Sequence, residues 1–288
     1  MSKINLYNET KFIMKKYNIV ANKKLGQNFL VNENVVDTIV NCAKITNEDL
    51  VIEIGPGLGT LTSRLIEKAG KVICIELDNR MINILKDRFS LYNNIEIIHE
   101  DVLKVDIKDL IKKEKENNNI KYAKIVANLP YYITTPIIMK LLEDELDIES
   151  ITIMIQKEVA QRICAEPGSD LSGAITYGIH YYTNPNSIIE VDKNSFIPEP
   201  EVQSEVIRLD ILKEKYINVK NPNYMFKIIK VAFMQRRKTL INALMNGNIV
   251  NSKEELEGVL EQLNIDKNIR GEKLTLEQFA QLSDKLCN

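Results

Sequence analysis

The chain has 288 residues, of which 44% are hydrophobic and 27% charged, with a net charge of −2, and this balance excludes a chain that is disordered throughout. No apolar stretch approaches the roughly 18 residues that cross a bilayer, and no apolar block near the start has the pattern of a signal peptide. Four separated cysteines without a Cys-x-x-Cys pair, together with two histidines, predict reduced thiols in a cytoplasmic protein without a metal site.

Short apolar segments alternate with amphipathic helical ones between residues 49 and 155. The predicted strands are Leu50–Ile54, Lys71–Ile75, Ile95–His99, Ile125–Ala127 and Ile151–Ile155. The predicted helices are about Leu58–Ala69, Arg80–Phe89 and Ile107–Lys115, and a polar insert at Lys115–Asn119 is expected to form a solvated loop. This alternation predicts an α/β fold with a parallel, doubly wound sheet that binds ligands at the carboxyl ends of its strands.

The character of the sequence changes after about Ile188, where two extended segments flank a proline-containing turn up to Leu209. This pattern predicts an antiparallel pair that closes one edge of the sheet. Beyond Leu212 the pattern is helical, with helices predicted at Tyr224–Met234, Thr239–Met245, Lys253–Leu263 and Leu276–Leu286. We therefore expect two domains, residues 1–211 with the ligand site and a small helical domain at residues 212–288.

The first predicted strand ends in a glycine-rich turn with glycines at positions 55, 57 and 59. Such a turn lets the backbone approach a ligand and exposes the amino end of the next helix. The same spacing occurs in nicotinamide enzymes and in simple tight turns, so it leaves the ligand open. Glu76 ends the second strand, where its carboxylate can accept hydrogen bonds from ribose hydroxyls. Asp101 and Asn128 follow the third and fourth strands, which gathers polar groups at one rim of the sheet.

The segment from Glu53 to Gly59 resembles the first motif of the class I methyltransferases, in which an acid precedes the glycines. The resemblance implies a Rossmann-like fold and S-adenosylmethionine as cofactor. It places Glu76 on the ribose, Asp101 near the adenine amine and Gly55 beside the methionine part, and it adds Gly57 and Asn128 to the cofactor-binding residues. Upstream, residues 27–30 are similar to the segment that covers the cofactor in adenosine methyltransferases of ribosomal RNA, which implies cofactor contacts from Asn28 and Leu30.

The tetrapeptide Asn128-Leu129-Pro130-Tyr131 directly follows the fourth strand. An adenine amine is a poor nucleophile because its lone pair is delocalised into the ring, and acceptors on its two hydrogens would localise that pair. The Asn128 carboxamide oxygen and the Leu129 carbonyl can supply these acceptors. Pro130 restricts the backbone at this point and so fixes the direction of the Leu129 carbonyl. Tyr131 offers a face for stacking an extruded base. A simple turn after a buried strand would have similar composition.

Two later segments point to the substrate. Residues 196–204 hold two prolines in an extended loop that can present Phe196 as a second jaw opposite Tyr131, although Phe196 in the core fits the pattern as well. Residues 1–30 carry six lysines and one acid, and residues 208–240 carry nine basic residues and two acids. These segments predict basic patches for a phosphate backbone, or else solvated surface. The three consecutive cations Arg236, Arg237 and Lys238 oppose the dipole of the helix that they precede, which favours a phosphate-binding role.

These segments together resemble the small-subunit ribosomal RNA adenine dimethyltransferases, from Lys24 to about Leu282. The resemblance implies conversion of two adjacent adenosines in the 3′-terminal hairpin loop of that RNA to N6,N6-dimethyladenosine, on a partly assembled subunit, by a monomer that needs no metal or membrane. The alternatives are an erythromycin-resistance type enzyme that modifies large-subunit RNA and a non-catalytic assembly-binding factor. A DNA adenine methyltransferase is disfavoured because the chain lacks room for a large sequence-reading domain.

Overall fold

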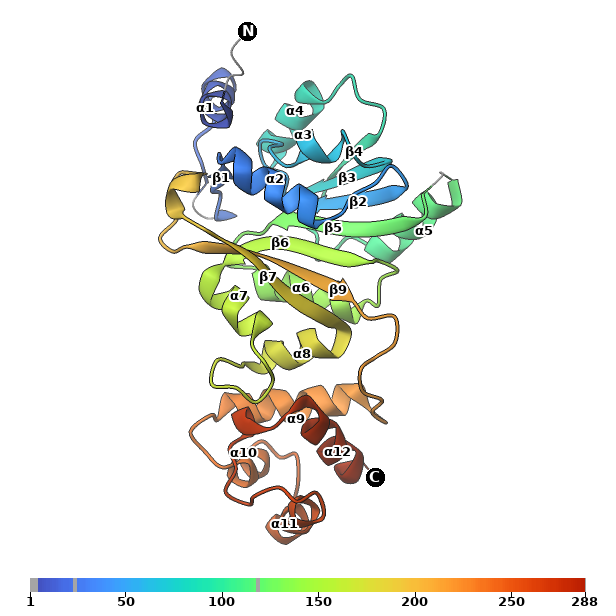
Figure 1. Cartoon of the computed structure of the whole chain (residues 1–288), viewed down its shortest axis with the longest axis vertical. Helices are drawn as coiled ribbons and strands as arrows, with labels where there is room; N and C mark the ends of the chain where they lie inside the picture. Colours follow the sequence, from blue (N-terminus) through green and yellow to red (C-terminus); the bar gives the residue numbers. More distant parts are fainter. Residues whose placement is uncertain (1–4, 23–24, 118–119, 288) are drawn as a thin grey trace. The chain divides into compact units, whose positions relative to one another are not determined.

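The computed structural model describes residues 5–22, 25–117 and 120–287, which form two compact units (Figure 1). The first contains residues 1–160 and 186–211, and the second contains residues 161–185 and 212–288. The expected boundary after residue 211 coincides with one of these divisions. The segment 161–185, which we assigned to the first domain, belongs to the second unit, because Tyr177 and Tyr181 are buried in the helical core there.

The first unit is built on a seven-stranded sheet with the order β4-β3-β2-β5-β6-β9-β7. Its strands are β2 (Asp49–Ile54), β3 (Lys71–Glu76), β4 (Ile95–His99), β5 (Tyr122–Asn128), β6 (Ser150–Gln156), β7 (Thr183–Val191) and β9 (Ser204–Ile211). The strands from β4 to β6 are parallel, and β9 pairs antiparallel with β6. The predicted α/β fold with a mostly parallel sheet and an antiparallel edge is therefore confirmed.

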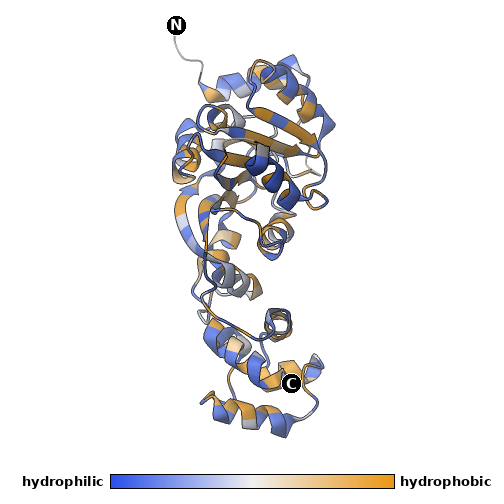
Figure 2. Ribbon diagram, turned by 90° about the vertical axis from the view of Figure 1, so that its right-hand side faces the viewer, coloured by the Kyte–Doolittle hydropathy of each residue, from blue (hydrophilic) through white to orange (hydrophobic). Residues whose placement is uncertain are grey.

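The central strands are continuous apolar runs because both of their faces are covered. Every residue of β2 is buried, and the strands of the sheet are largely orange in Figure 2. The polar exception at the start of β2 is Asp49, which is fully buried and lies 2.8 Å from the Lys124 ammonium of β5. This ion pair lies near the amino ends of β2 and β5, whereas ligands of such sheets bind at the carboxyl ends.

Helices flank the sheet (Figure 1). The helices of this unit are α1 (Leu6–Lys16), α2 (Glu33–Cys42), α3 (Thr62–Leu65), α4 (Asn79–Arg88), α5 (Ile107–Asn117), α6 (Thr134–Glu143) and α7 (Lys157–Cys164), which runs past the division at residue 160. Helix α1 lies apart from the sheet and is joined to α4 by ion pairs. A small second sheet pairs β1 (Phe29–Leu30) with β8 (Phe196–Ile197). The helix that we predicted over Leu58–Ala69 is confined to α3, and the expected loop at 115–119 begins inside α5, while residues 118–119 lie outside the described residues.

The second unit contains α8 (Ala174–Tyr182), α9 (Pro222–Met234), α10 (Leu240–Asn246), α11 (Lys253–Gln262) and α12 (Leu276–Leu286). The last four helices begin and end within two residues of the predicted positions. Each of them begins after an Asn, Thr or Ser whose side chain accepts a hydrogen bond from a backbone amide of the first turn. Within the described ranges, none of the helices is long and apolar enough to span a bilayer.

Candidate active site

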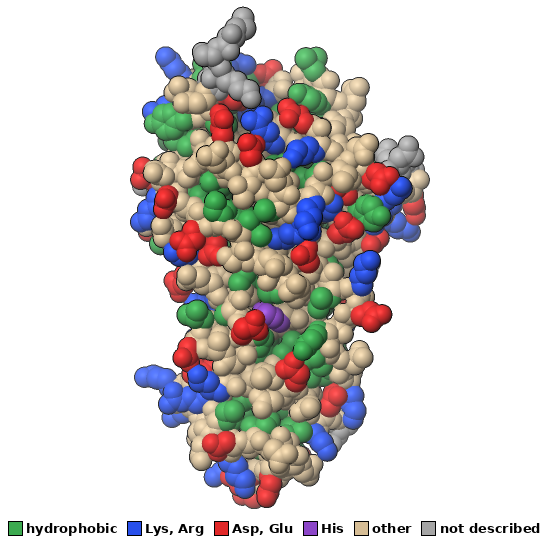
Figure 3. Space-filling model, viewed as in Figure 1, with side chains coloured by type: hydrophobic (Ala, Val, Ile, Leu, Met, Phe, Trp, Pro, Cys, Tyr) green, Lys and Arg blue, Asp and Glu red, His purple; other side chains and the backbone are tan. Residues whose placement is uncertain are grey.

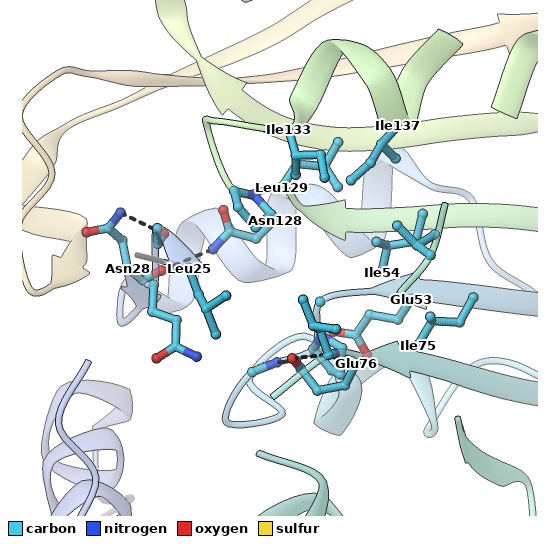
Figure 4. A pocket seen from close by; sticks show the side chains of 18 of the residues that line it. Leu25, Asn28, Glu53, Ile54, Ile75, Glu76, Asn128, Leu129, Ile133 and Ile137 are labelled. Carbon is cyan, nitrogen blue, oxygen red and sulfur yellow. Dashed lines mark hydrogen bonds between the residues drawn. The ribbon is translucent and has the colours of Figure 1, made fainter. Parts of the chain in front are cut away.

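A pocket lies at the carboxyl ends of β2, β3 and β5 (Figure 4), and its empty volume, including space open to solvent, is about 1090 Å³. The structure gathers nearly all of the predicted site residues around it, although they come from segments far apart in the chain. The predicted residues that line it are Asn28, Leu30, Gly55, Gly57, Glu76, Asp101, Asn128, Leu129, Pro130 and Tyr131. This pocket is therefore the candidate active site.

The turn after β2 forms the floor of the pocket because its glycines adopt positive φ angles that other residues rarely take. At Gly55, where φ is +67°, an added Cβ would meet no atom within 4 Å, so the backbone faces open pocket space. At Gly59, where φ is +83°, an added Cβ would lie 2.6 Å from the ring of Phe89. One glycine therefore leaves room for a ligand, and the other allows α4 to pack closely against the turn.

Glu76 ends β3 with a carboxylate that is held in one orientation by three backbone amides. It accepts hydrogen bonds from Gly57 at 3.0 Å, Leu77 at 2.9 Å and Asp78 at 2.8 Å. Burial raises the pKa of Glu76, and the three amide hydrogen bonds oppose that rise. A fixed carboxylate at the rim of the pocket is suited to accept hydrogen bonds from a diol.

Glu53 is a second carboxyl in the pocket wall, and we did not predict a role for it beyond its place in the motif. Its side chain is 1% exposed and accepts a hydrogen bond from the Thr62 hydroxyl at 2.6 Å. Burial raises the pKa of Glu53 to about 7, while the hydrogen bonds from Thr62 and Cys74 oppose the rise. The charge of this part of the pocket therefore changes near neutral pH.

The segment 25–28 forms the wall opposite the strand ends and is fixed at two points. Gln27 Nε2 donates to the buried carboxylate of Asp78 at 2.9 Å, and Gln27 Oε1 accepts from the backbone amide of Asn22 at 2.9 Å. Asn28 Nδ2 donates to the carbonyl of Gly26 at 3.2 Å, which closes a local turn (Figure 4). We did not foresee the contribution of Gln27, because its partner lies 51 residues away.

Asn128 ends β5 and donates from Nδ2 to the carbonyl of Asn28 at 3.2 Å (Figure 4). This bond sets the orientation of the carboxamide, so that Oδ1 is its acceptor in the pocket. Leu129 is buried, and its amide donates to the carbonyl of Met154 at 3.1 Å. Within the described part of the chain, no donor is bonded to Asn128 Oδ1 or to the Leu129 carbonyl oxygen.

The turn continues through Pro130, whose carbonyl accepts a hydrogen bond from the Thr134 hydroxyl at 3.0 Å. Tyr131 is half-buried, and its hydroxyl lies 2.7 Å from the Ser204 hydroxyl at the start of β9. Burial raises the pKa of Tyr131, so the phenol keeps its proton. Tyr132, which we did not single out, also lines the pocket and is 58% exposed. Two neighbouring tyrosines therefore line the pocket.

The prediction that Phe196 forms a second jaw opposite Tyr131 is not met by the structure. Phe196 is 3% exposed, pairs with Leu30 across the β1–β8 ladder, and packs in the core with Val126, Met154 and Val206. It does not line the pocket. The pairing of β8 with β1 directs the Phe196 side chain into the hydrophobic core, where its apolar surface is removed from water.

The three cations at 236–238 lie in the turn between α9 and α10, just before the cap residue Thr239. Arg236 is partly committed within its own unit, since its guanidinium lies 2.7 Å from the Glu272 carboxylate. Arg237 and Lys238 are exposed. Lys and Arg side chains gather at the left edge of the helical unit in Figure 3. The turn thus presents cations to solvent.

The basic segment at the start of the chain is described only in part, because Lys3, Lys23 and Lys24 lie outside the described residues. Lys16 is paired with Asp87 on α4 at 3.1 Å. Lys15 is exposed on α1. Because Lys16 is paired, this helix carries less free charge than its composition suggests.

The shape and the polar groups of the pocket fit S-adenosylmethionine. The empty space over Gly55 admits a ligand against the turn, and the fixed Glu76 carboxylate suits a ribose diol. Asp101 is half-buried at the rim beside Val102, which can face a flat base. Much of the remaining wall comes from apolar residues that we did not single out in the sequence, among them Leu25, Ile54, Ile75, Leu77, Ile133 and Ile137.

Comparisons with known proteins agree with this site. A sequence model of the family described as "Ribosomal RNA adenine dimethylase" matches residues 18–287. A protein of Alkaliphilus oremlandii named "Ribosomal RNA small subunit methyltransferase A" is 46% identical over 287 residues, which are 100% of this chain and 99% of that protein. A protein of the same name from Clostridium botulinum is 48% identical over 275 residues, covering 96% of this chain and 97% of that protein.

Solved structures agree as well. A dimethyladenosine transferase from Plasmodium falciparum superposes with a TM-score of 0.74 and 28% identity, over 88% of this chain and 95% of that one. The 23S rRNA methyltransferase ErmE has a TM-score of 0.68 at 23% identity, over 91% of this chain and 100% of that one, which shows a shared fold. The chain therefore belongs to the ribosomal RNA adenine dimethylase family, a family of S-adenosylmethionine-dependent methyltransferases.

Proposed function

We propose that this protein dimethylates the N6 amines of two adjacent adenosines in the 3′-terminal hairpin loop of small-subunit ribosomal RNA. The observation that carries the proposal is the pair of uncommitted acceptors, Asn128 Oδ1 and the Leu129 carbonyl, at the edge of a pocket that fits the cofactor. Two acceptors match the two hydrogens of an exocyclic amine. Holding both hydrogens localises the nitrogen lone pair and points it at the cofactor.

The chain's residues contribute position and electrostatics. S-adenosylmethionine supplies, when bound, a methyl group that its sulfonium activates, so that a strong general base is not required. Asn28 orients the Asn128 carboxamide through its carbonyl, and the buried amide of Leu129 is fixed to β6. Fixed acceptors of this kind contribute to rate because they need not reorganise during the reaction. The amine proton can leave to solvent after transfer.

On the cofactor side, we assign the ribose to Glu76, the adenine amine to Asp101, and the methionine part to the turn at Gly55 and Gly57. Asn28 and Leu30 would cover the cofactor from the opposite wall. On the substrate side, we assign the stacking surface to Tyr131, since its ring lines the pocket and its pKa keeps it neutral. A base in a single-stranded loop can be extruded into such a site at small cost.

The small subunit is favoured over the large one because the relatives at 46–48% identity carry "small subunit" in their names, whereas ErmE shares the fold alone. We propose that residues 212–288 form an RNA-recognition domain, with phosphate contacts from Arg236, Arg237 and Lys238. We further propose that the protein acts in the cytoplasm as a monomer, on a partly assembled subunit. The acidic overall balance suits a site that RNA and ribosomal proteins form together.

The proposal is tested by incubating the protein with labelled S-adenosylmethionine and small subunits from a strain that lacks the enzyme. We expect label in two adjacent adenosines of the 3′-terminal loop when the RNA is mapped by mass spectrometry. Label in large-subunit RNA, or none in either, would show that the substrate is wrong.

The role of Asn128 is tested by Asn128→Ala, which removes the acceptor and the bond to Asn28. We expect the methylation rate to fall at least about 100-fold, as for the loss of one fixed polar group at a reacting centre. Cofactor affinity should fall no more than about 10-fold, the value of one hydrogen bond. Calorimetric titration with S-adenosylhomocysteine measures the second quantity, and near-normal turnover would refute the role.

A further inference from the structure

The segment 196–204 reaches the side chain of Tyr131 through its last residue. Ser204, its last residue, is fully buried and places its hydroxyl 2.7 Å from the hydroxyl of Tyr131. The two residues lie 73 positions apart in the chain. Phe196 is in the core, whereas Ser204 meets the hydroxyl of the proposed stacking residue.

Ser204 is itself held firmly. It is the first residue of β9 and pairs with Gln156 in the antiparallel ladder with β6. The neighbouring Lys157 amide also donates to the carbonyl of Gln203 at 3.0 Å. Tyr131, by contrast, lies in a turn between β5 and α6, where no ladder fixes its side chain. The rigid partner in this pair is therefore Ser204.

We propose that Ser204 is a positioning residue for the reaction, which sets the plane and direction of the Tyr131 ring on which the target adenine stacks. The proposal rests on the function proposed above. A phenolic O–H lies in the plane of its ring, so a bonded partner at a fixed place constrains both the axis and the plane of the ring. Without Ser204 the half-exposed ring can turn toward water, because a buried hydroxyl without a partner is unfavourable.

We expect the loss of Ser204 to lower kcat, the rate at saturating substrate, and to leave KM nearly unchanged. The RNA is held by many contacts outside the pocket, whereas the angle of the stacked base decides whether its amine lies in line with the cofactor. For Ser204→Ala we expect kcat to fall about 3- to 10-fold, the range that one hydrogen bond supports. The KM for the small subunit should stay within about 2-fold.

The matched control is Ser150→Ala. Ser150 is a fully buried serine on β6, at the opposite end of the same β6–β9 ladder, where it pairs with Asp210. Its hydroxyl has no hydrogen-bond partner among the described residues. The same substitution in the same pair of strands should leave kcat unchanged, which separates positioning from a general effect on the sheet.

The decisive experiment is a double-mutant cycle on unmethylated small subunits with Ser204→Ala, Tyr131→Phe and the double variant, each checked by thermal melting. Tyr131→Phe keeps the ring and loses the bond, so we expect a similar loss of kcat. The double variant leaves neither hydroxyl unpaired, so its loss should not exceed the larger single loss.

Several outcomes would overturn the inference. These are an unchanged kcat in Ser204→Ala, losses that multiply in the double variant, a loss confined to KM, or an equal loss in Ser150→Ala. If Ser204→Ala does not fold, Tyr131→Phe decides alone, and an unchanged kcat there overturns the inference. Failure of the wild-type protein to methylate small subunits would instead refute the proposed function, so the two failures are distinguishable.

Discussion

Glu53→Gln is the substitution whose effect the structure allows us to work out most fully. The carboxyl is 1% exposed in the wall of the pocket and accepts a hydrogen bond from Thr62. Glutamine has nearly the same shape and can still accept that hydrogen bond, but it cannot ionise. The substitution therefore isolates the cost of placing a negative charge at this position.

The sign follows from the folded pKa, which burial raises from 4.5 to about 7. Between these values the folded protein binds more protons than the unfolded chain, so its stability falls as the pH rises through this window. The neutral form contributes its full stability below about pH 4.5, and that contribution is lost as the pH passes 7. The difference between the two values corresponds to about 3 kcal/mol in the free energy of unfolding.

We therefore expect the stability of Glu53→Gln relative to the wild-type protein to rise by about 2–3 kcal/mol between pH 5 and pH 8. Urea denaturation of the cofactor-free proteins at both pH values measures this. Glu67→Gln, which removes a charge from the exposed surface, is the control. A stability difference that stays constant between pH 5 and pH 8 would show that Glu53 is not a destabilised charge.

The glycine turn and the basic turn give two more expectations. Gly55→Ala should weaken cofactor binding with a loss of only about 1–2 kcal/mol in stability, because its Cβ would enter open pocket space. Gly59→Ala should cost about 2–4 kcal/mol, because its Cβ would lie 2.6 Å from a buried ring; equal thermal melting of the two variants would contradict this. Replacing Arg237 and Lys238 with alanine should lower the steepness of log RNA affinity against log salt by about 1.5, because two phosphate contacts are lost; filter binding at several salt concentrations measures this. Arg236 is left in place because replacing it would also free the Glu272 carboxylate. An unchanged salt slope would show that Arg237 and Lys238 do not bind phosphate.

The sequence was informative wherever a residue's position along an element fixed its place in space. The strand ends at Glu76 and Asn128 follow directly from apolar runs, and parallel strands bring their carboxyl ends to one edge of the sheet. The helices of the second unit were equally readable, since their caps and apolar periodicity lie in adjacent residues. The segment 161–185 was assigned to the wrong unit, because nothing local says which core its tyrosines fill.

The sequence by itself determined the sheet, the glycine turn and the polar residues at the strand ends, since these depend on short apolar runs and on local backbone preferences. Only the tertiary structure decided that Phe196 enters the core, that Ser204 meets Tyr131, and that the carbonyl of Asn28 orients Asn128 across 100 residues. It also decided the pKa of Glu53, because burial is a property of the packed fold. Contacts between segments so distant arise from how loops cross the sheet, and no local pattern encodes that path.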